Sequence, residues 1–248
     1  MERAKGLSGN QLKLIAILAM TVDHLTWVFF PGTQKAWYVM ALHVIGRLTA
    51  PIMWFFIAEG CRYTRHRGKY LARLFAFAVV SHFAYDFAFG IPFLPLSTGV
   101  FNQTSVMWSL ALAASLIFLF SSDRIPQWGK MLLLALFCVL AFPSDWSSIA
   151  VMCPLFLYFH RDRFPKQAFD IVFWTFVYAA VYFLFLDKPY GALQMFTCLS
   201  IPLLKLYNGQ RGNWKGMKWF FYLYYPAHLV AVGILRLVLH GEVPILFS

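Results

Sequence analysis

The sequence predicts an all-α bundle of about nine transmembrane helices. Hydrophobic residues make up 60% of the 248 residues and charged residues only 12%, whereas a soluble domain carries roughly a quarter charged residues. The mean hydropathy of +0.64 is also high. One water-soluble core could not bury this much apolar surface. We therefore expect a single integral membrane domain over residues 1–248, with the lipid bilayer covering much of its surface.

Nine apolar segments approach the length of about 20 residues that a helix needs to cross a bilayer. We predict helices over residues 12–30, 38–62, 70–89, 104–120, 131–142, 147–159, 168–186, 191–207 and 219–239. The fifth and sixth are short, and together they could form one thin hairpin that turns through Pro143, Ser144 and Asp145. The stretch around Pro92 and Pro95 could also re-enter the membrane.

Basic residues set the predicted orientation. Only Lys35 and Lys188 fall on the outer side of this layout, whereas most of the 21 Lys and Arg residues, beginning with Arg3 and Lys5, fall on the inner side. Cytoplasmic loops carry such an excess of positive charge, so we expect the N-terminus in the cytoplasm. Because the formal charge of +11 lies in short loops between apolar runs, we expect no nucleic-acid partner.

Ionisable residues within spans are costly to bury, so each is a candidate functional residue. They are Asp23, His24, His43, Arg47, Glu59, His82, Asp86, His228 and Arg236. A buried Arg47 requires a carboxylate partner, for which Asp23, Glu59 and Asp86 are candidates. His82 and Asp86 are four residues apart and can hydrogen-bond on one helix face, either to tune a base or to satisfy a buried pair. The histidines lack paired-ligand spacing, so we expect no metal.

Lys13 and His24 share one face of the first helix. Eleven residues correspond to three helical turns with an offset of about 20° and a rise of roughly 16 Å. A cation at the cytoplasmic mouth suits phosphate binding, and a neutral imidazole deeper in the membrane suits proton transfer. A lysine that extends to the membrane surface and a hydrogen-bonded structural histidine fit the same spacing.

A polar, glycine-containing turn precedes the last helix. Tyr207, Asn208, Gly209, Gln210, Arg211 and Gly212 are followed by Lys215 and Lys218. This basic, backbone-rich segment is suited to phosphate, although an ordinary cytoplasmic loop would also be basic. Further on, Pro226 should kink the helix beside His228.

Several segments together resemble the TraX family, which is related to conjugative-pilin acetylation. The matching residues are 12–24, 46–51, 57–60, 63–64, 69–74, 206–209, 211–212, 220–222 and 225–229. The first two helices are also similar to the wider transmembrane acyltransferases, in which a basic residue and an essential histidine have ten residues between them, as Lys13 and His24 do. The resemblance implies acetyl transfer from cytosolic acetyl-CoA to an acceptor on the far side of the membrane. The pilin N-terminus is the substrate named for TraX, and a cell-surface glycan amine or hydroxyl would use the same half-reaction.

The resemblance also implies roles for individual residues. His24 would act as general base or acetyl carrier, Arg47 would stabilise the oxyanion, and His228 or Asp23 would position the acceptor. Acetyl-CoA would be held by Lys13, Arg65, Lys69, Asn208, Arg211 and Lys215. We expect a multi-pass acyltransferase of the bacterial inner membrane. Two other classes fit part of the pattern: a proton-coupled small-molecule transporter and a non-catalytic pilus-assembly membrane protein.

Overall fold

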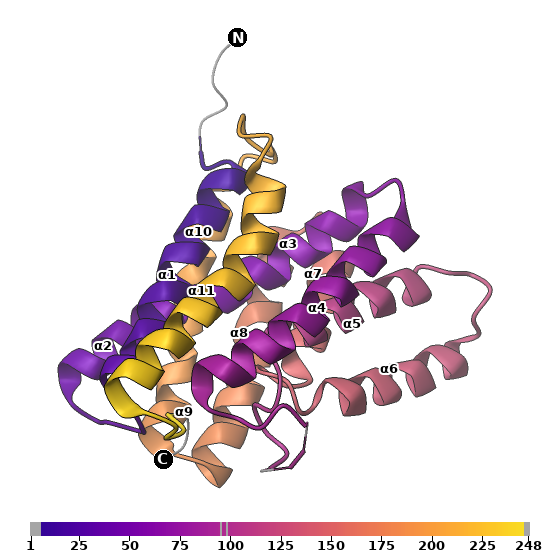
Figure 1. Cartoon of the computed structure of the whole chain (residues 1–248). Coiled ribbons are helices and arrows are strands. Elements are labelled where there is room, and N and C mark those ends of the chain that lie inside the picture. Colours follow the sequence, from indigo (N-terminus) through magenta and orange to yellow (C-terminus); the bar gives the residue numbers. More distant parts are fainter. Residues whose placement is uncertain (1–5, 95, 98, 246–248) are drawn as a thin grey trace.

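The protein is built from helices (Figure 1). The computed structural model describes residues 6–94, 96–97 and 99–245, which form eleven α-helices, one short 3-10 helix and no β-strand. The predicted all-α membrane class is confirmed. Arg3, Lys5 and Pro95, which entered the predictions above, lie outside the described residues.

Seven of the predicted segments are single helices whose ends lie within four residues of the prediction. They are α1 (Gly9–Phe29), α4 (Arg67–Phe89), α5 (Val106–Phe120), α6 (Gln127–Ala141), α7 (Ile149–Phe159), α8 (Phe164–Phe185) and α11 (Met217–His240). The two short helices α6 and α7 are joined by a turn over residues 142–148. Hydropathy located these helices because each must present apolar side chains to lipid or to its neighbours.

The other two predicted segments are interrupted helices. Segment 38–62 divides into α2 (Trp37–Gly46) and α3 (Thr49–Tyr63), and segment 191–207 into α9 (Lys188–Gln194), η1 (Met195–Leu199) and α10 (Ser200–Lys205). Pro51 lies in the first turn of α3, where its missing N–H has no helical partner to lose. Pro202 has no backbone N–H to donate to the preceding turn. The chain just before it adopts the tighter 3-10 geometry.

Five helical segments in the described chain are long and apolar enough to cross a membrane: α1, the α2–α3 pair, α4, α8 and α11. Helices α1, α4, α8 and α11 begin at the same end of the bundle (Figure 1). At this end, the start of α1 forms backbone hydrogen bonds with the segment before α11. In one of them the Gly9 N–H donates to the Gln210 carbonyl oxygen at 2.8 Å. We call this end the basic end, because most of the Lys and Arg residues flank these helix starts.

Helix α5 is largely buried among its neighbours. It packs against α3, α4, α6 and α7, and Ala111, Ala113 and Ala114 on it are fully buried. Small side chains allow close helix approach where lipid supplies no hydrophobic driving force. Helix α6 lies at the periphery (Figure 1) and buries only Ala141.

Enlarging a buried alanine of α5 should destabilise the bundle. Ala114→Leu adds three carbons where there is no free space, and such overpacking costs about 1–3 kcal/mol. Thermal unfolding in a mild detergent should show a lower midpoint. Ala135→Leu is the matched control, since Ala135 is exposed on α6 and the same substitution should leave the midpoint unchanged. Equal midpoints for the two variants would contradict the close packing of α5 around Ala114.

Candidate functional site

A buried ion pair joins α1 to the break between α2 and α3. Asp23 Oδ1 accepts hydrogen bonds from the Arg47 guanidinium at 2.8 Å and from His43 Nδ1 at 2.9 Å. The other guanidinium nitrogens donate to Gln194 Oε1 at 2.9 Å and to the His43 carbonyl at 3.2 Å. Of the three carboxylates considered for Arg47, Asp23 is therefore the partner.

Glycine at position 46 makes this pair possible. A side chain there would collide with the Asp23 carboxylate, so only glycine lets α2 approach α1 this closely. Asp23 does not orient the neighbouring His24 ring, because its hydrogen bonds go to His43 and Arg47.

His24 and His228 form a second pair across α1 and α11. Their Nδ1 and Nε2 atoms are 2.7 Å apart, and the rings are stacked with centroids at 5.0 Å. His228 Nδ1 lies 3.1 Å from the Tyr224 carbonyl oxygen, which can only accept, so this nitrogen carries the hydrogen. In neutral His228 the Nε2 is then an acceptor, and His24 Nδ1 must donate to it. His24 Nε2 is left with a free lone pair, and no described residue hydrogen-bonds to it.

Two small cavities meet at this cluster. One has about 50 Å³ and extends toward Met53, and the other has about 60 Å³. They share the side chains of Asp23, His24, Arg47, Asp145 and Trp146. The second cavity is also walled by aromatic side chains, namely Trp27, Tyr85, Phe89, Tyr178, Tyr182 and Tyr190.

Asp145 is a site residue that the sequence did not reveal as one. It lies on the turn between α6 and α7, which folds inward because the Asp145 N–H donates to the Thr104 carbonyl at 2.9 Å. Burial raises the pKa of the Asp145 carboxyl to about 7, while the positive charge of Arg47 acts in the opposite direction. No sequence pattern predicts this placement, since it depends on the contact between two loops.

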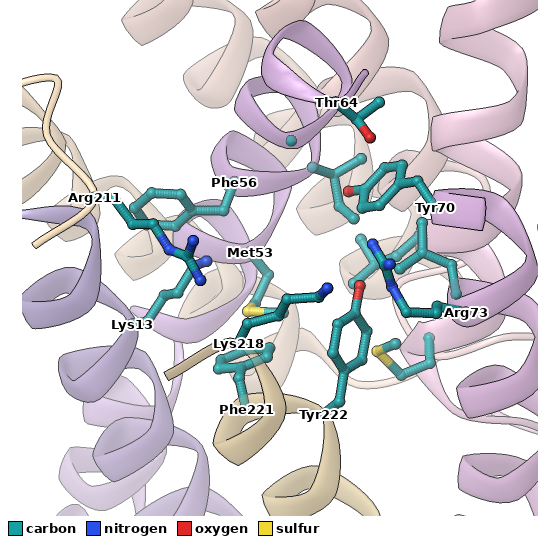
Figure 2. Close-up of a pocket in the computed structure, with 15 residues that line it drawn as sticks. Lys13, Met53, Phe56, Thr64, Tyr70, Arg73, Arg211, Lys218, Phe221 and Tyr222 are labelled. Carbon is teal, nitrogen blue, oxygen red and sulfur yellow. The ribbon is translucent and has the colours of Figure 1, made fainter. Parts of the chain in front are cut away.

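A larger cavity, of about 310 Å³, opens at the basic end between α1, α3, α4 and α11. Lys13, Arg73, Arg211 and Lys218 line it together with aromatic residues, and no carboxylate does. Figure 2 shows Lys13 and Arg211 on one side, Arg73 on the other and Lys218 reaching between them. The buried Arg73 Nε has no hydrogen-bond partner in the described chain. Four cations without a counter-charge favour an anionic ligand.

The structure separates the residues predicted to hold phosphate. Lys13 and Arg211 line the cation-lined cavity, whereas its lining does not include the other four, Arg65, Lys69, Asn208 and Lys215. Arg73 and Lys218 line it and were missed. Because α4 begins at Arg67, Lys69 is exposed in its first turn and Arg73 lies one turn deeper.

Met53 lies between the cavities, because it lines both the cation-lined cavity and the smaller one beside His24. Met20 and His24 are 7% and 9% exposed, and Lys13 faces the cation-lined cavity. The predicted stripe of Lys13 and His24 therefore faces the protein interior, as expected from their spacing.

His82 and Asp86 lie side by side as predicted, with Nδ1 and Oδ2 3.2 Å apart, but neither carboxylate oxygen of Asp86 has a hydrogen-bond partner within the described residues. His82 additionally contacts the Thr104 hydroxyl at 3.1 Å and the Phe93 carbonyl at 2.9 Å. Neither residue lines the cavities around His24, and His82 ties α4 to the segment that precedes α5.

These features define a polytopic membrane protein in which a cation-lined cavity at one end is separated by Met53 from the cavities of a buried histidine–arginine cluster. The sequence model of the TraX protein family matches residues 8–236, and the chain belongs to this family, which confirms the resemblance noted from its motifs. The chain is 31% identical over 243 residues to the probable fimbrial assembly protein FimC, serogroup H1, of Dichelobacter nodosus, an alignment that covers 92% of this chain and 96% of the relative. No solved structure matches.

Gly46→Ala should disrupt the buried ion pair. The added methyl group displaces the Asp23 carboxylate from Arg47, and breaking a buried pair costs about 3–5 kcal/mol. Denaturant unfolding of the detergent-solubilised protein measures the loss. Gly68→Ala is the matched control, because nothing lies within 4 Å of a side chain at that helical position. A Gly46→Ala variant as stable as the control would refute the tight approach of α2 to α1.

Proposed function

We propose that the protein is a membrane-embedded acetyltransferase that moves an acetyl group from cytosolic acetyl-CoA to an acceptor on the outer side of the inner membrane. The observation that carries this proposal is that a cation-lined cavity and the cavity beside His24 share Met53 as a wall, and that His24 has a free ring nitrogen. The name of the Dichelobacter relative supports a role in fimbrial or pilus assembly.

The cavity at the basic end suits the nucleotide part of acetyl-CoA. Lys13, Arg73, Arg211 and Lys218 supply the charge that the phosphate groups require, and the walls formed by Phe56 and other aromatic residues can stack on adenine. The narrow pantetheine arm then extends past Met53. The roughly 16 Å rise between Lys13 and His24 is a distance that this flexible arm can span.

His24 Nε2 is the base in this reaction. It removes a proton from the acceptor amine or hydroxyl as the acceptor nitrogen or oxygen attacks the thioester carbon. The carbon–sulfur bond breaks, its electron pair remains on sulfur, and the protonated His24 returns the proton to the thiolate. His228 accepts the His24 Nδ1–H bond and thereby stabilises the imidazolium. Transfer through an acetyl-histidine would use the same nitrogen.

Arg47 is placed to stabilise the oxyanion. Guanidinium has five N–H groups, and three of them are held by Asp23, Gln194 and the His43 carbonyl. The remaining two are available to the cavities that Arg47 shares with His24. A preorganised donor of this kind lowers the barrier of acyl transfer without reorganisation.

The acceptor would enter the aromatic-walled cavity beside Asp145 from the end opposite the basic end. Both a pilin N-terminal amine and a glycan amine or hydroxyl can supply the attacking atom. A non-catalytic part in fimbrial assembly also agrees with the relative's name, but it gives the four unpaired cations and the free His24 nitrogen no role.

His24→Ala should abolish acetyl transfer while the protein still folds. Loss of a general base costs about 10²–10⁴-fold in rate. The assay is release of CoA and labelling of an outer-face acceptor in proteoliposomes supplied with labelled acetyl-CoA. His66→Ala, at an exposed histidine before α4, should retain wild-type rates. Full activity of His24→Ala would refute the assignment, and transmembrane flux of label without CoA release would favour a transporter.

Arg73→Gln should weaken acetyl-CoA binding rather than the chemical step. Losing one charged phosphate contact of about 1.5–3 kcal/mol should raise the KM for acetyl-CoA at least about tenfold with kcat unchanged. The kinetic parameters are measured in the same proteoliposomes. Arg124→Gln removes an equal charge from an exposed loop outside the cavity and should leave KM unaltered. Equal KM values for the two variants would exclude the cation-lined cavity as the donor site.

A further inference from the structure

A separate groove of about 680 Å³ lies at the basic end, between α3, the start of α8 and α10. It opens on a different face of α3 from the cation-lined cavity, because Phe55 and Glu59 line the groove whereas Phe56 and Gly60 line the cavity. The acetyl-transfer proposal uses none of the charged residues in this groove.

Three cations from three different segments line the groove: Arg62 from α3, Arg161 from the turn before α8 and Lys205 from α10. Asp162 approaches both arginines only at 3.9 Å and is 76% exposed, so these pairs are weak. The guanidinium groups therefore keep donors free for a ligand.

Glu59 adds a negative charge to the same groove. It is half-buried on α3 and lies within electrostatic range of Arg62 and Arg161. Within the described residues it makes no hydrogen bond and no ion pair. The groove therefore offers cationic donors and a free carboxylate side by side, an arrangement complementary to a zwitterion.

The remaining walls of the groove are mainly apolar, although Tyr63, Gln167 and Tyr207 are among them. The apolar residues are Phe55, Phe164, Pro165, Ala168, Ile201 and Leu204. Farther from the basic end along the same elements, α8 exposes Val172 and η1 exposes Phe196. A ligand whose polar head occupies the charged end would thus continue onto an apolar surface within the bilayer.

We propose that this groove binds a phospholipid with a phosphoethanolamine headgroup. Arg62, Arg161 and Lys205 hold the phosphate, Glu59 holds the ammonium, and an acyl chain lies along the apolar walls. A soluble phosphate compound would leave the apolar walls exposed. A headgroup without an amine would leave the negative charge of Glu59 beside the negative phosphate with no cation between them.

The test compares headgroups directly. The full-length protein is reconstituted in nanodiscs that contain equimolar phosphatidylethanolamine and phosphatidylglycerol, and the lipids that remain bound after transfer to detergent are counted by native mass spectrometry. Wild type should retain phosphatidylethanolamine about fivefold over phosphatidylglycerol, as expected for one partly exposed charge interaction. Glu59→Gln should reduce this ratio to about one, and Arg62→Gln should lower retention of both lipids.

Lys205→Gln gives a second test at an exposed position on α10 and should also lower retention of both lipids. Arg124→Gln, outside the groove, is the matched charge control and should behave as wild type. The proposal is overturned if Glu59→Gln, Arg62→Gln and Lys205→Gln all retain the same lipids as wild type. It is also overturned if free phosphoethanolamine displaces the bound lipid, because a headgroup without chains would then suffice. Retention is measured without acetyl-CoA, so this result is independent of the proposed reaction.

Discussion

The ion pair between Asp23 and Arg47 is the interaction on which the rest of the site depends. A guanidinium within a membrane span requires a carboxylate, because an unpaired charge there is prohibitively costly. The pair fastens α1 to the break between α2 and α3, and the bond from Arg47 to Gln194 adds α9 to the same point. Gly46 permits the approach, and the turn after it aims Arg47 into the cavity beside His24. One electrostatic requirement thereby positions helices that are far apart in the sequence.

The histidine pair follows a similar rule of polar satisfaction. The Tyr224 carbonyl fixes the tautomer of His228, and His228 in turn fixes that of His24, so a backbone oxygen in α11 decides which nitrogen of α1 has a lone pair. The parallel stacking of the two rings holds this orientation. The His24 ring is thus oriented without a carboxylate, and Asp23 pairs with Arg47 instead.

The helices and the inward stripe of α1 could be predicted from the sequence, because hydropathy and the 3.6-residue period are local properties. The need of Arg47 for a carboxylate was also predictable, although the choice of Asp23 over Glu59 and Asp86 was not. The helix breaks were missed because each hydrophobic segment continues across its break, although Pro51 and Pro202 lie near the breaks. The position of a residue along the helix axis was also hard to predict. Lys69 and Arg73 occupy one face of α4, and only the start of the helix at Arg67 shows which of them reaches the cavity.

The unequal sizes of the cavities bear on how an acyl-transfer site would avoid hydrolysis. The cation-lined cavity of about 310 Å³ is open to the medium, whereas the two beside His24 hold about 50 and 60 Å³, room for only a few water molecules. An acetyl group and the attacking atom of an acceptor would displace most of that water. With water displaced, the charge of Arg47 acts in a low dielectric and is correspondingly stronger. In the proposed reaction, a path past Met53, which lines both cavities, would admit only a thin acyl-bearing arm and would keep bulk water away from the histidine.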